Sequence, residues 1–159
     1  MLSSDINQKI AGALRAKDAV RLSTLRLLSS AFNYERIAKQ HELTDEEEFV
    51  VIRREAKKRS DAIESIKQAQ GKRTSSSEDE LKTKLAKEEE ELGILKEFLP
   101  EEMPDNELVR LVNTTIFQTS ASGVKDMGKV IGEVLAKAKG TVDGKRVAEK
   151  VKEALETRD

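Results

Sequence analysis

Residues 49–66 read FVVIRREAKKRSDAIESI and residues 81–99 read LKTKLAKEEEELGILKEFL, and these two stretches decide the fold. Each carries apolar side chains at alternating spacings of three and four, which places them on one face of a helix. Each stripe also contains a single charge, and the two charges are opposite. The stripes are Phe49, Ile52, Ala56, Arg59, Ile63 and Ile66, and Leu81, Leu85, Glu88, Leu92, Leu95 and Leu99. The pattern predicts two long helices packed as an antiparallel hairpin.

The register of this hairpin follows from folding the chain back about residues 71–77. Ile63 then faces Leu85, and Arg59 faces Glu88. We expect Arg59 and Glu88 to form a polar layer that sets the register, so that removing one partner costs more stability than removing both. The alternative is a flared hairpin end at which both charged groups extend into water. A separation above about 6 Å between the two side chains would contradict the pairing.

Capping signals place the ends of other helices. Thr44 with Glu47 and Ser77 with Glu80 are capping boxes, in which each side chain bonds the other's backbone N–H. The residue before Pro100 is disfavoured in helical geometry, so the hairpin ends there. Predicted helices cover residues 4–16, 18–40, 44–70, 77–98, 105–119, 125–138 and 143–156, with a polar loop at 71–77.

These elements predict an all-α chain. Residues 1–100 are expected to form an N-terminal helical bundle that contains the long antiparallel hairpin. Residues 101–159 are expected to form a small three-helix C-terminal subdomain. The helix at 18–40 is apolar on most sides, which predicts a central position in the bundle.

The composition argues against several classes of function. The chain has 159 residues, no Cys and a single His, which excludes disulfides, thiolate zinc sites and multi-histidine metal sites. The run Glu88–Glu91 lacks the geometry of a metal site and, apart from Glu88, is expected to be solvated. We therefore expect no catalytic residue, no metal and no cofactor. No apolar run is long enough for a membrane span and no secretion signal is evident, so a cytoplasmic location is expected.

The net charge of −1 conceals a segmental pattern. Residues 1–74 carry 15 basic and 11 acidic side chains, residues 75–123 carry 5 and 12, and residues 124–159 carry 9 and 7. Basic segments therefore flank an acidic one. Solvated helical faces that compensate one another in three dimensions explain this pattern most simply, and a surface for an anionic partner is the alternative.

The C-terminal basic segment holds the candidate binding residues. Gly128 and Gly132 stand one turn apart inside a short predicted helix, at a cost of about 1 kcal/mol each relative to alanine. Close packing of a neighbouring helix is the favoured explanation, and close approach of a phosphodiester backbone is the alternative. Cations around the last two helices would neutralise phosphates: Lys125, Lys129, Lys137, Lys139, Lys145 and Arg146. Residues 140–146 are one residue short of a phosphate-binding loop, so a turn into a helix capped by Asp143 is favoured.

Two other features bear on nucleic-acid binding. A second basic face in the hairpin lies opposite the apolar stripe, where nearby acidic residues reduce the available charge; it consists of Arg53, Arg54, Lys57 and Lys58. The aromatic residues mostly occupy core-like positions; they are Phe32, Tyr34, Phe49, Phe98 and Phe117. Recognition of bases usually needs exposed aromatics, so we expect contact with nucleic acid through its backbone and shape.

Several blocks of the sequence resemble the YqeY-like family (GatB/YqeY). In the N-terminal half they are KDAVRLSTLR (17–26), LTDEE (43–47), IRREAKKR (52–59) and EFLP (97–100). In the C-terminal half they are KDMGKVIG (125–132) and DGK (143–145). The resemblance covers nearly the whole chain, and the longer Ser-rich segment around residues 71–80 departs from the family pattern.

That family is all-helical and is similar to the tail domain of GatB, the B subunit of glutamine-dependent aminoacyl-tRNA amidotransferase. The resemblance implies that residues 125–132 and 140–146 correspond to the part of the tail that contacts tRNA, whereas amide transfer belongs to separate domains. A carbon–nitrogen ligase label with glutamine as amido-N-donor would rest on this similarity alone. We expect a non-catalytic adaptor that interacts with tRNA or other RNA. The alternatives are a protein–protein module whose acidic middle docks a basic partner, and an accessory of an amidotransferase.

Overall fold

The computed structural model describes residues 1–70 and 77–157, so the predicted loop at 71–77 lies outside the described residues except for Ser77. The described residues form seven α-helices and one 3-10 helix, η1, without a strand. Their bounds are α1 Leu2–Arg15, α2 Ala19–Lys39, α3 Asp45–Ala69, α4 Glu78–Lys96, α5 Asp105–Thr119, η1 Val124–Asp126, α6 Met127–Ala138 and α7 Gly144–Glu156. The all-α prediction is confirmed, and no described helix is long and apolar enough to cross a membrane.

Both predicted capping boxes are present. The Thr44 and Ser77 hydroxyl groups accept hydrogen bonds from the backbone N–H of Glu47 and Glu80, and those two carboxylates accept from the backbone N–H of Thr44 and Ser77. The backbone hydrogen bond from Thr44 is the main reason that the pKa of Glu47 is lowered. The first turns of α3 and α4 therefore begin where the sequence predicts.

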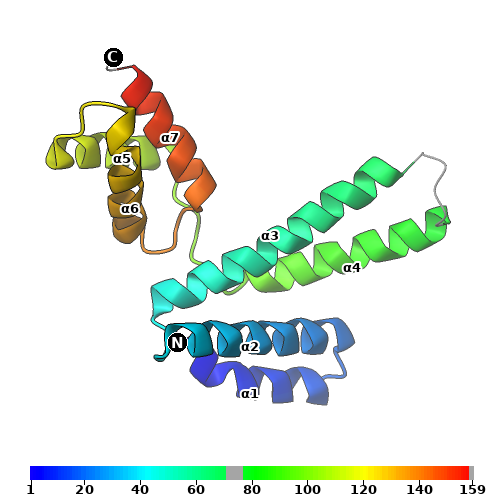
Figure 1. Ribbon diagram of the computed structural model, residues 1–159. Coiled ribbons are helices and arrows are strands. Elements are labelled where there is room, and N and C mark those ends of the chain that lie inside the picture. The colour runs from blue at the N-terminus through cyan, green and yellow to red at the C-terminus, as the bar shows by residue number, and fades with distance from the viewer. Residues whose placement is uncertain (71–76, 158–159) are drawn as a thin grey trace. The chain divides into compact units, whose positions relative to one another are not determined.

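The chain divides into two compact units, Met1–Leu99 and Pro100–Asp159. In the first unit α1 packs on α2, α3 packs on α4, and α2 also contacts α3 and α4 (Figure 1). Its core contains Ile6, Leu28, Phe32, Leu43, Val51, Ile52, Ala56 and Leu95. In the second unit α5, α6 and α7 surround a separate core that contains Leu108, Val112, Ile116, Val130, Val134, Val147, Val151 and Leu155.

α2 is less enclosed than its apolar sequence predicts. Although it contacts three other helices, Leu27, Tyr34 and Ile37 are 52%, 76% and 70% exposed. Leu25 and Leu28, which point toward the other helices, are buried. The prediction of a central helix is therefore right for the inner face of α2 and wrong for its outer face.

Arg59 of α3 pairs with two carboxylates of α4. Its Nη1 lies 3.1 Å from Oε2 of Glu88 and 3.1 Å from Oε2 of Glu91. The Glu91 side chain is only 4% exposed, so the prediction that the acidic run beyond Glu88 is solvated is wrong at this residue. Thr24 and Leu28 of α2 line the same small recess as Glu91. α2 therefore shields a carboxylate that the α3–α4 hairpin alone would leave in water.

A second buried carboxylate caps α1. Glu48 of α3 is 2% exposed and accepts hydrogen bonds from the backbone N–H of Leu2 at 2.7 Å and of Ser3 at 3.0 Å, and from the Ser3 hydroxyl. These N–H groups have no partner within α1, and negative charge is favourable at a helix N-terminus. The start of α1 is thus stabilised by a residue more than 40 positions away, which the α1 sequence does not predict.

Candidate nucleic-acid interface

The exposed side of α6 carries the two glycines that the sequence singles out. Gly128 and Gly132 are exposed, and a Cβ added at either position would meet no atom of another described element within 4 Å. The favoured explanation of the pair, close packing of a neighbouring helix, is therefore wrong. Val130 and Val134 lie on the opposite side and are fully buried. α6 consequently presents an outer surface with little side-chain bulk.

Lysines lie beside these glycines in α6 and at both of its ends. Lys129 lies between the glycines, Lys125 lies in η1 just before α6, and Lys139 is the residue that caps its C-terminus. All three lysines are exposed and form no ion pair with the described residues. We call Lys125, Gly128, Lys129, Gly132 and Lys139 the glycine face.

Lys145 is exposed in the first turn of α7 and also forms no ion pair within the described part of the chain. Lys137, by contrast, is already engaged. Its Nζ donates to Gln118 Oε1 at 2.6 Å and lies 3.4 Å from Thr115 Oγ1, both on α5. Lys137 therefore joins α6 to α5, and its charge is partly satisfied within the unit.

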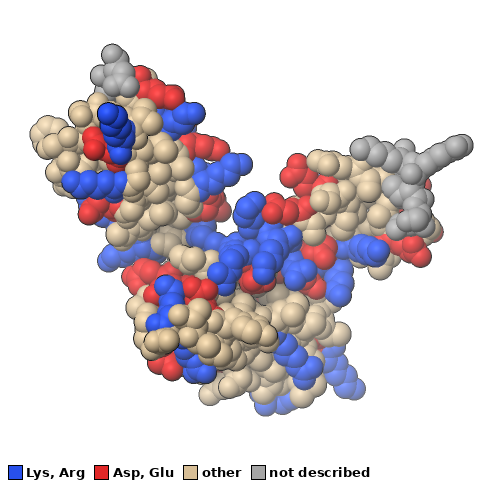
Figure 2. All heavy atoms as spheres, viewed as in Figure 1, with Lys and Arg blue, Asp and Glu red and all other residues tan. Residues whose placement is uncertain are grey.

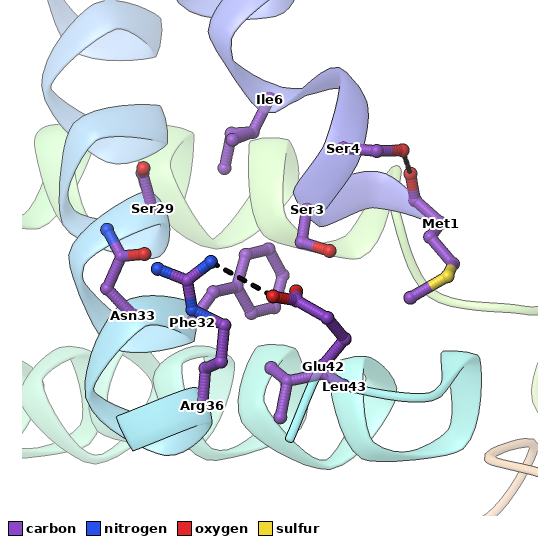
Figure 3. Close-up of a pocket in the computed structure, with 10 residues that line it drawn as sticks. All are labelled: Met1, Ser3, Ser4, Ile6, Ser29, Phe32, Asn33, Arg36, Glu42 and Leu43. Atoms are coloured by element: carbon purple, nitrogen blue, oxygen red, sulfur yellow. Dashed lines mark hydrogen bonds and ion pairs between the residues drawn. The ribbon is translucent and has the colours of Figure 1, made fainter. Parts of the chain in front are cut away.

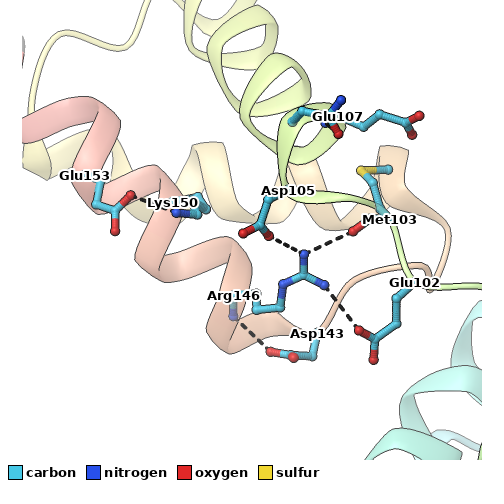
Figure 4. Close-up of polar contacts among 9 residues, drawn as sticks. Glu102, Met103, Asp105, Glu107, Asp143, Arg146, Lys150 and Glu153 are labelled. Atoms are coloured by element: carbon cyan, nitrogen blue, oxygen red, sulfur yellow. Dashed lines mark hydrogen bonds and ion pairs between the residues drawn. The ribbon is translucent and has the colours of Figure 1, made fainter.

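Arg146 is engaged more strongly (Figure 4). Its guanidinium donates to the Met103 carbonyl oxygen at 3.0 Å and pairs with Glu102 at 3.5 Å and with Asp105 at 2.5 Å. The hydrogen bond from Arg146 is the main reason that the pKa of Asp105 is lowered. Arg146 thus links α7 to the segment before α5. Two carboxylates already neutralise its charge, which the sequence predicts to be available for phosphate binding.

The segment between α6 and α7 is the glycine-assisted turn that the sequence predicts. Gly140 has φ 78°, in the left-handed region that glycine favours. The Thr141 carbonyl oxygen accepts a hydrogen bond from the Met103 N–H at 2.9 Å, and the Asp143 carboxylate accepts from the Arg146 N–H at 2.9 Å. The N-cap role of Asp143 is therefore confirmed.

Two aromatic residues depart from the core-like positions predicted for them. Phe117 and Tyr34 are 81% and 76% exposed, whereas Phe32 is 3% exposed. A positional signal for Phe117 was present in the sequence, because the buried stripe of α5 runs through Leu108, Val112 and Ile116 and leaves the next residue outside it. The ring of Phe117 is therefore accessible for stacking.

The second basic face, on α3, carries less net charge than its sequence indicates. Figure 2 shows basic side chains gathered over the middle of α3. Of the four cations predicted for this face, Arg54 pairs with Glu35, Lys57 with Asp61 and Lys58 with Glu55. Neighbouring carboxylates thus balance these three cations, whereas Lys125, Lys129 and Lys139 of the glycine face form no ion pair with the described residues.

A cleft of about 410 Å³ opens in the first unit between α1, α2 and the segment that joins α2 to α3 (Figure 3). Ile6, Phe32 and Leu43 line it, and an ion pair of 3.2 Å joins Arg36 to Glu42 beside them. The Ser3 hydroxyl, which also lines the cleft, donates a hydrogen bond to the Glu48 carboxylate that caps α1. Among the described residues, no three His, Asp or Glu side chains are grouped as a metal site.

Comparison with known proteins identifies the family of this chain. No curated protein gives a significant match to the sequence. A family model described as Yqey-like protein matches residues 3–155, which include both units and the glycine face. Because the match extends over nearly the whole chain, the protein belongs to the YqeY-like family.

Proposed function

We propose that this protein is a non-catalytic, cytoplasmic adaptor that binds tRNA through the glycine face of its C-terminal unit. The exposure of Gly128 and Gly132 carries the proposal. Gly132 lies in the interior of α6, where glycine costs about 1 kcal/mol relative to alanine, and no neighbouring described helix offsets that cost. An external backbone that approaches α6 closely would offset it.

Phosphodiester chemistry fits the surroundings of these glycines. The exposed lysines Lys125, Lys129 and Lys139 can each approach a phosphate, and Lys145 at the start of α7 adds a fourth cation. Four phosphate contacts predict a binding constant that falls with salt concentration with a logarithmic slope of about −3. Lys137 and Arg146 would act by holding the unit together, because their charges are already engaged.

The decisive experiment replaces Gly132 by alanine and measures two quantities. The variant should unfold at higher temperature, because alanine favours the helix by about 1 kcal/mol. It should bind fluorescently labelled tRNA at low salt more weakly than the unaltered protein, because the methyl group obstructs the backbone. Gly93→Ala is the matched control, since Gly93 is also helical and open to solvent but lies in the first unit. It should gain stability without losing affinity.

Charge reversal gives an independent test of the same face. The triple replacement of Lys125, Lys129 and Lys139 by glutamate should abolish tRNA binding at low salt while leaving the helical content unchanged, because these side chains are exposed. If the unaltered protein shifts no tRNA at low salt, or if the triple variant binds as well as the unaltered protein, the proposal is wrong.

A protein–protein module is the second candidate function. The exposed apolar side chains of Tyr34 and Ile37 on α2, together with Val50 on α3, favour it, because such groups are common at interfaces. This candidate, like the role of an amidotransferase accessory, predicts a co-purifying protein and indifference to the lysine replacements. Any carbon–nitrogen ligase activity would then belong to the partner.

A further inference from the structure

Phe117 is the most exposed of the large apolar side chains in the described residues, at 81%. It lies on the side of α5 opposite the core, which is formed by Leu108, Val112 and Ile116. Exposing a phenyl ring gains nothing for the fold, so packing within the unit does not explain the residue.

Polar and cationic groups surround this ring. Arg110, Asn113 and Thr114 precede it by seven, four and three residues, so they occupy the same face of α5, and all three are exposed. Arg110 forms no ion pair with the described residues. Gln118, the next residue, is held by Lys137 of α6 at 2.6 Å. A single aromatic ring among hydrogen-bonding groups and cations suits a planar, polar-edged and anionic ligand better than an apolar helix, which needs a continuous apolar patch.

We propose that Phe117 stacks on an unpaired base of the bound RNA, with Arg110 against the adjoining phosphate and Asn113 against the edge of the base. This inference rests on the proposed function and deepens it, because the glycine face reads only the backbone. The preferred ligand is therefore an RNA with a single-stranded loop or end rather than a continuous duplex. Stacking on aromatic side chains is the usual means of holding such bases.

Substitutions at Phe117 separate stacking from simple apolar contact. Phe117→Ala should weaken binding of labelled tRNA by about tenfold, the effect expected for one stacked base. Phe117→Leu keeps the apolar surface without the ring and should lose about as much. The salt dependence should stay unchanged in both variants, because no charge is removed. Tyr34→Ala is the matched control, as it removes an equally exposed aromatic from the first unit, and it should leave binding intact.

Phe117→Trp provides a direct signal, because the chain contains no other tryptophan. This variant should retain tRNA affinity, and its fluorescence should be quenched by tRNA but not by a fully paired RNA duplex. Unchanged affinity of Phe117→Ala, or absence of quenching, would overturn the inference while leaving the proposed function standing. Full affinity of Phe117→Leu would also overturn it and would assign the ring to an apolar contact. If the unaltered protein binds no tRNA, the proposed function and this inference fail together.

Discussion

Replacing Arg59 by methionine tests the buried charge cluster between α3 and α4. The substitution keeps an unbranched side chain of similar reach but removes the guanidinium that pairs with Glu88 and Glu91. The side chains of Arg59 and Glu88 are 23% and 21% exposed, whereas that of Glu91 is 4% exposed. After the substitution, the ion pair that remains for Glu91 among the described residues is a distant one with Lys87, whose Nζ is 3.8 Å from Oε1 and whose side chain is 60% exposed.

The structure sets the size of the expected effect. Removing one member of a buried ion pair costs about 3–5 kcal/mol. The partial exposure of Arg59 and Glu88 places this case near the lower limit, at about 3 kcal/mol. The first unit has 99 residues, so the melting temperature should fall by about 12–24 °C. Glu88→Gln should cost less than about 1 kcal/mol, because Arg59 still pairs with Glu91.

Urea unfolding followed by circular dichroism measures these differences, provided that separate transitions are fitted for the two units. The double replacement of Arg59 by methionine and Glu91 by leucine should regain about 2 kcal/mol relative to Arg59→Met, because no carboxylate then remains buried without a partner. A cost below about 1 kcal/mol for Arg59→Met would refute the reasoning. So would a double variant no more stable than the single one.

Two further predictions concern the other carboxylates. Glu48→Ala should destabilise the first unit by about 2 kcal/mol in urea unfolding, because two N–H groups at the start of α1 lose their acceptor; an unchanged midpoint would contradict this capping role. The hydrogen bond from Arg146 lowers the pKa of Asp105 in the folded state, so this carboxylate contributes stability above its ordinary pKa of about 4, and that contribution is lost as the pH falls through the lowered value. Arg146→Leu should flatten the decline in stability of the second unit below about pH 4, and an equally steep decline in the variant would count against the assignment.

The helical elements could be read from local sequence because the signals that produce them are local. Thr44 with Glu47 and Ser77 with Glu80 satisfy one another's backbone groups within a single turn, so their spacing is sufficient to place both helix starts. The spacing of Arg59 and Glu88 likewise follows from helical periodicity in two segments of known direction. Such inferences need no information about a third element.

Burial of a residue on one helix depends on the other helices that pack against it. The sequence therefore predicted some buried residues as exposed and some exposed residues as buried. Glu91 belongs to a run of four glutamates that reads as a solvated face, yet α2 covers it. Tyr34 and Phe117 read as core residues, yet no element covers them in the part of the chain that the structure describes. Burial could not be predicted for Gly128 and Gly132 either, because two glycines one helical turn apart are equally compatible with a packed and with an exposed helix face.

The sequence by itself determined an all-α chain, the starts of α3 and α4 and the likeness to the YqeY-like family, because these follow from periodicity, capping boxes and the order of motifs along the chain. Only the tertiary structure decided which cations remain available. Arg146 and Lys129 are both basic residues of the C-terminal segment. Arg146 pairs with acidic side chains more than 40 residues earlier in the chain, whereas Lys129 stays exposed. The same holds for the glycines of α6. Whether a helix face is packed or exposed depends on every element around it, and the local sequence of that helix does not specify those neighbours.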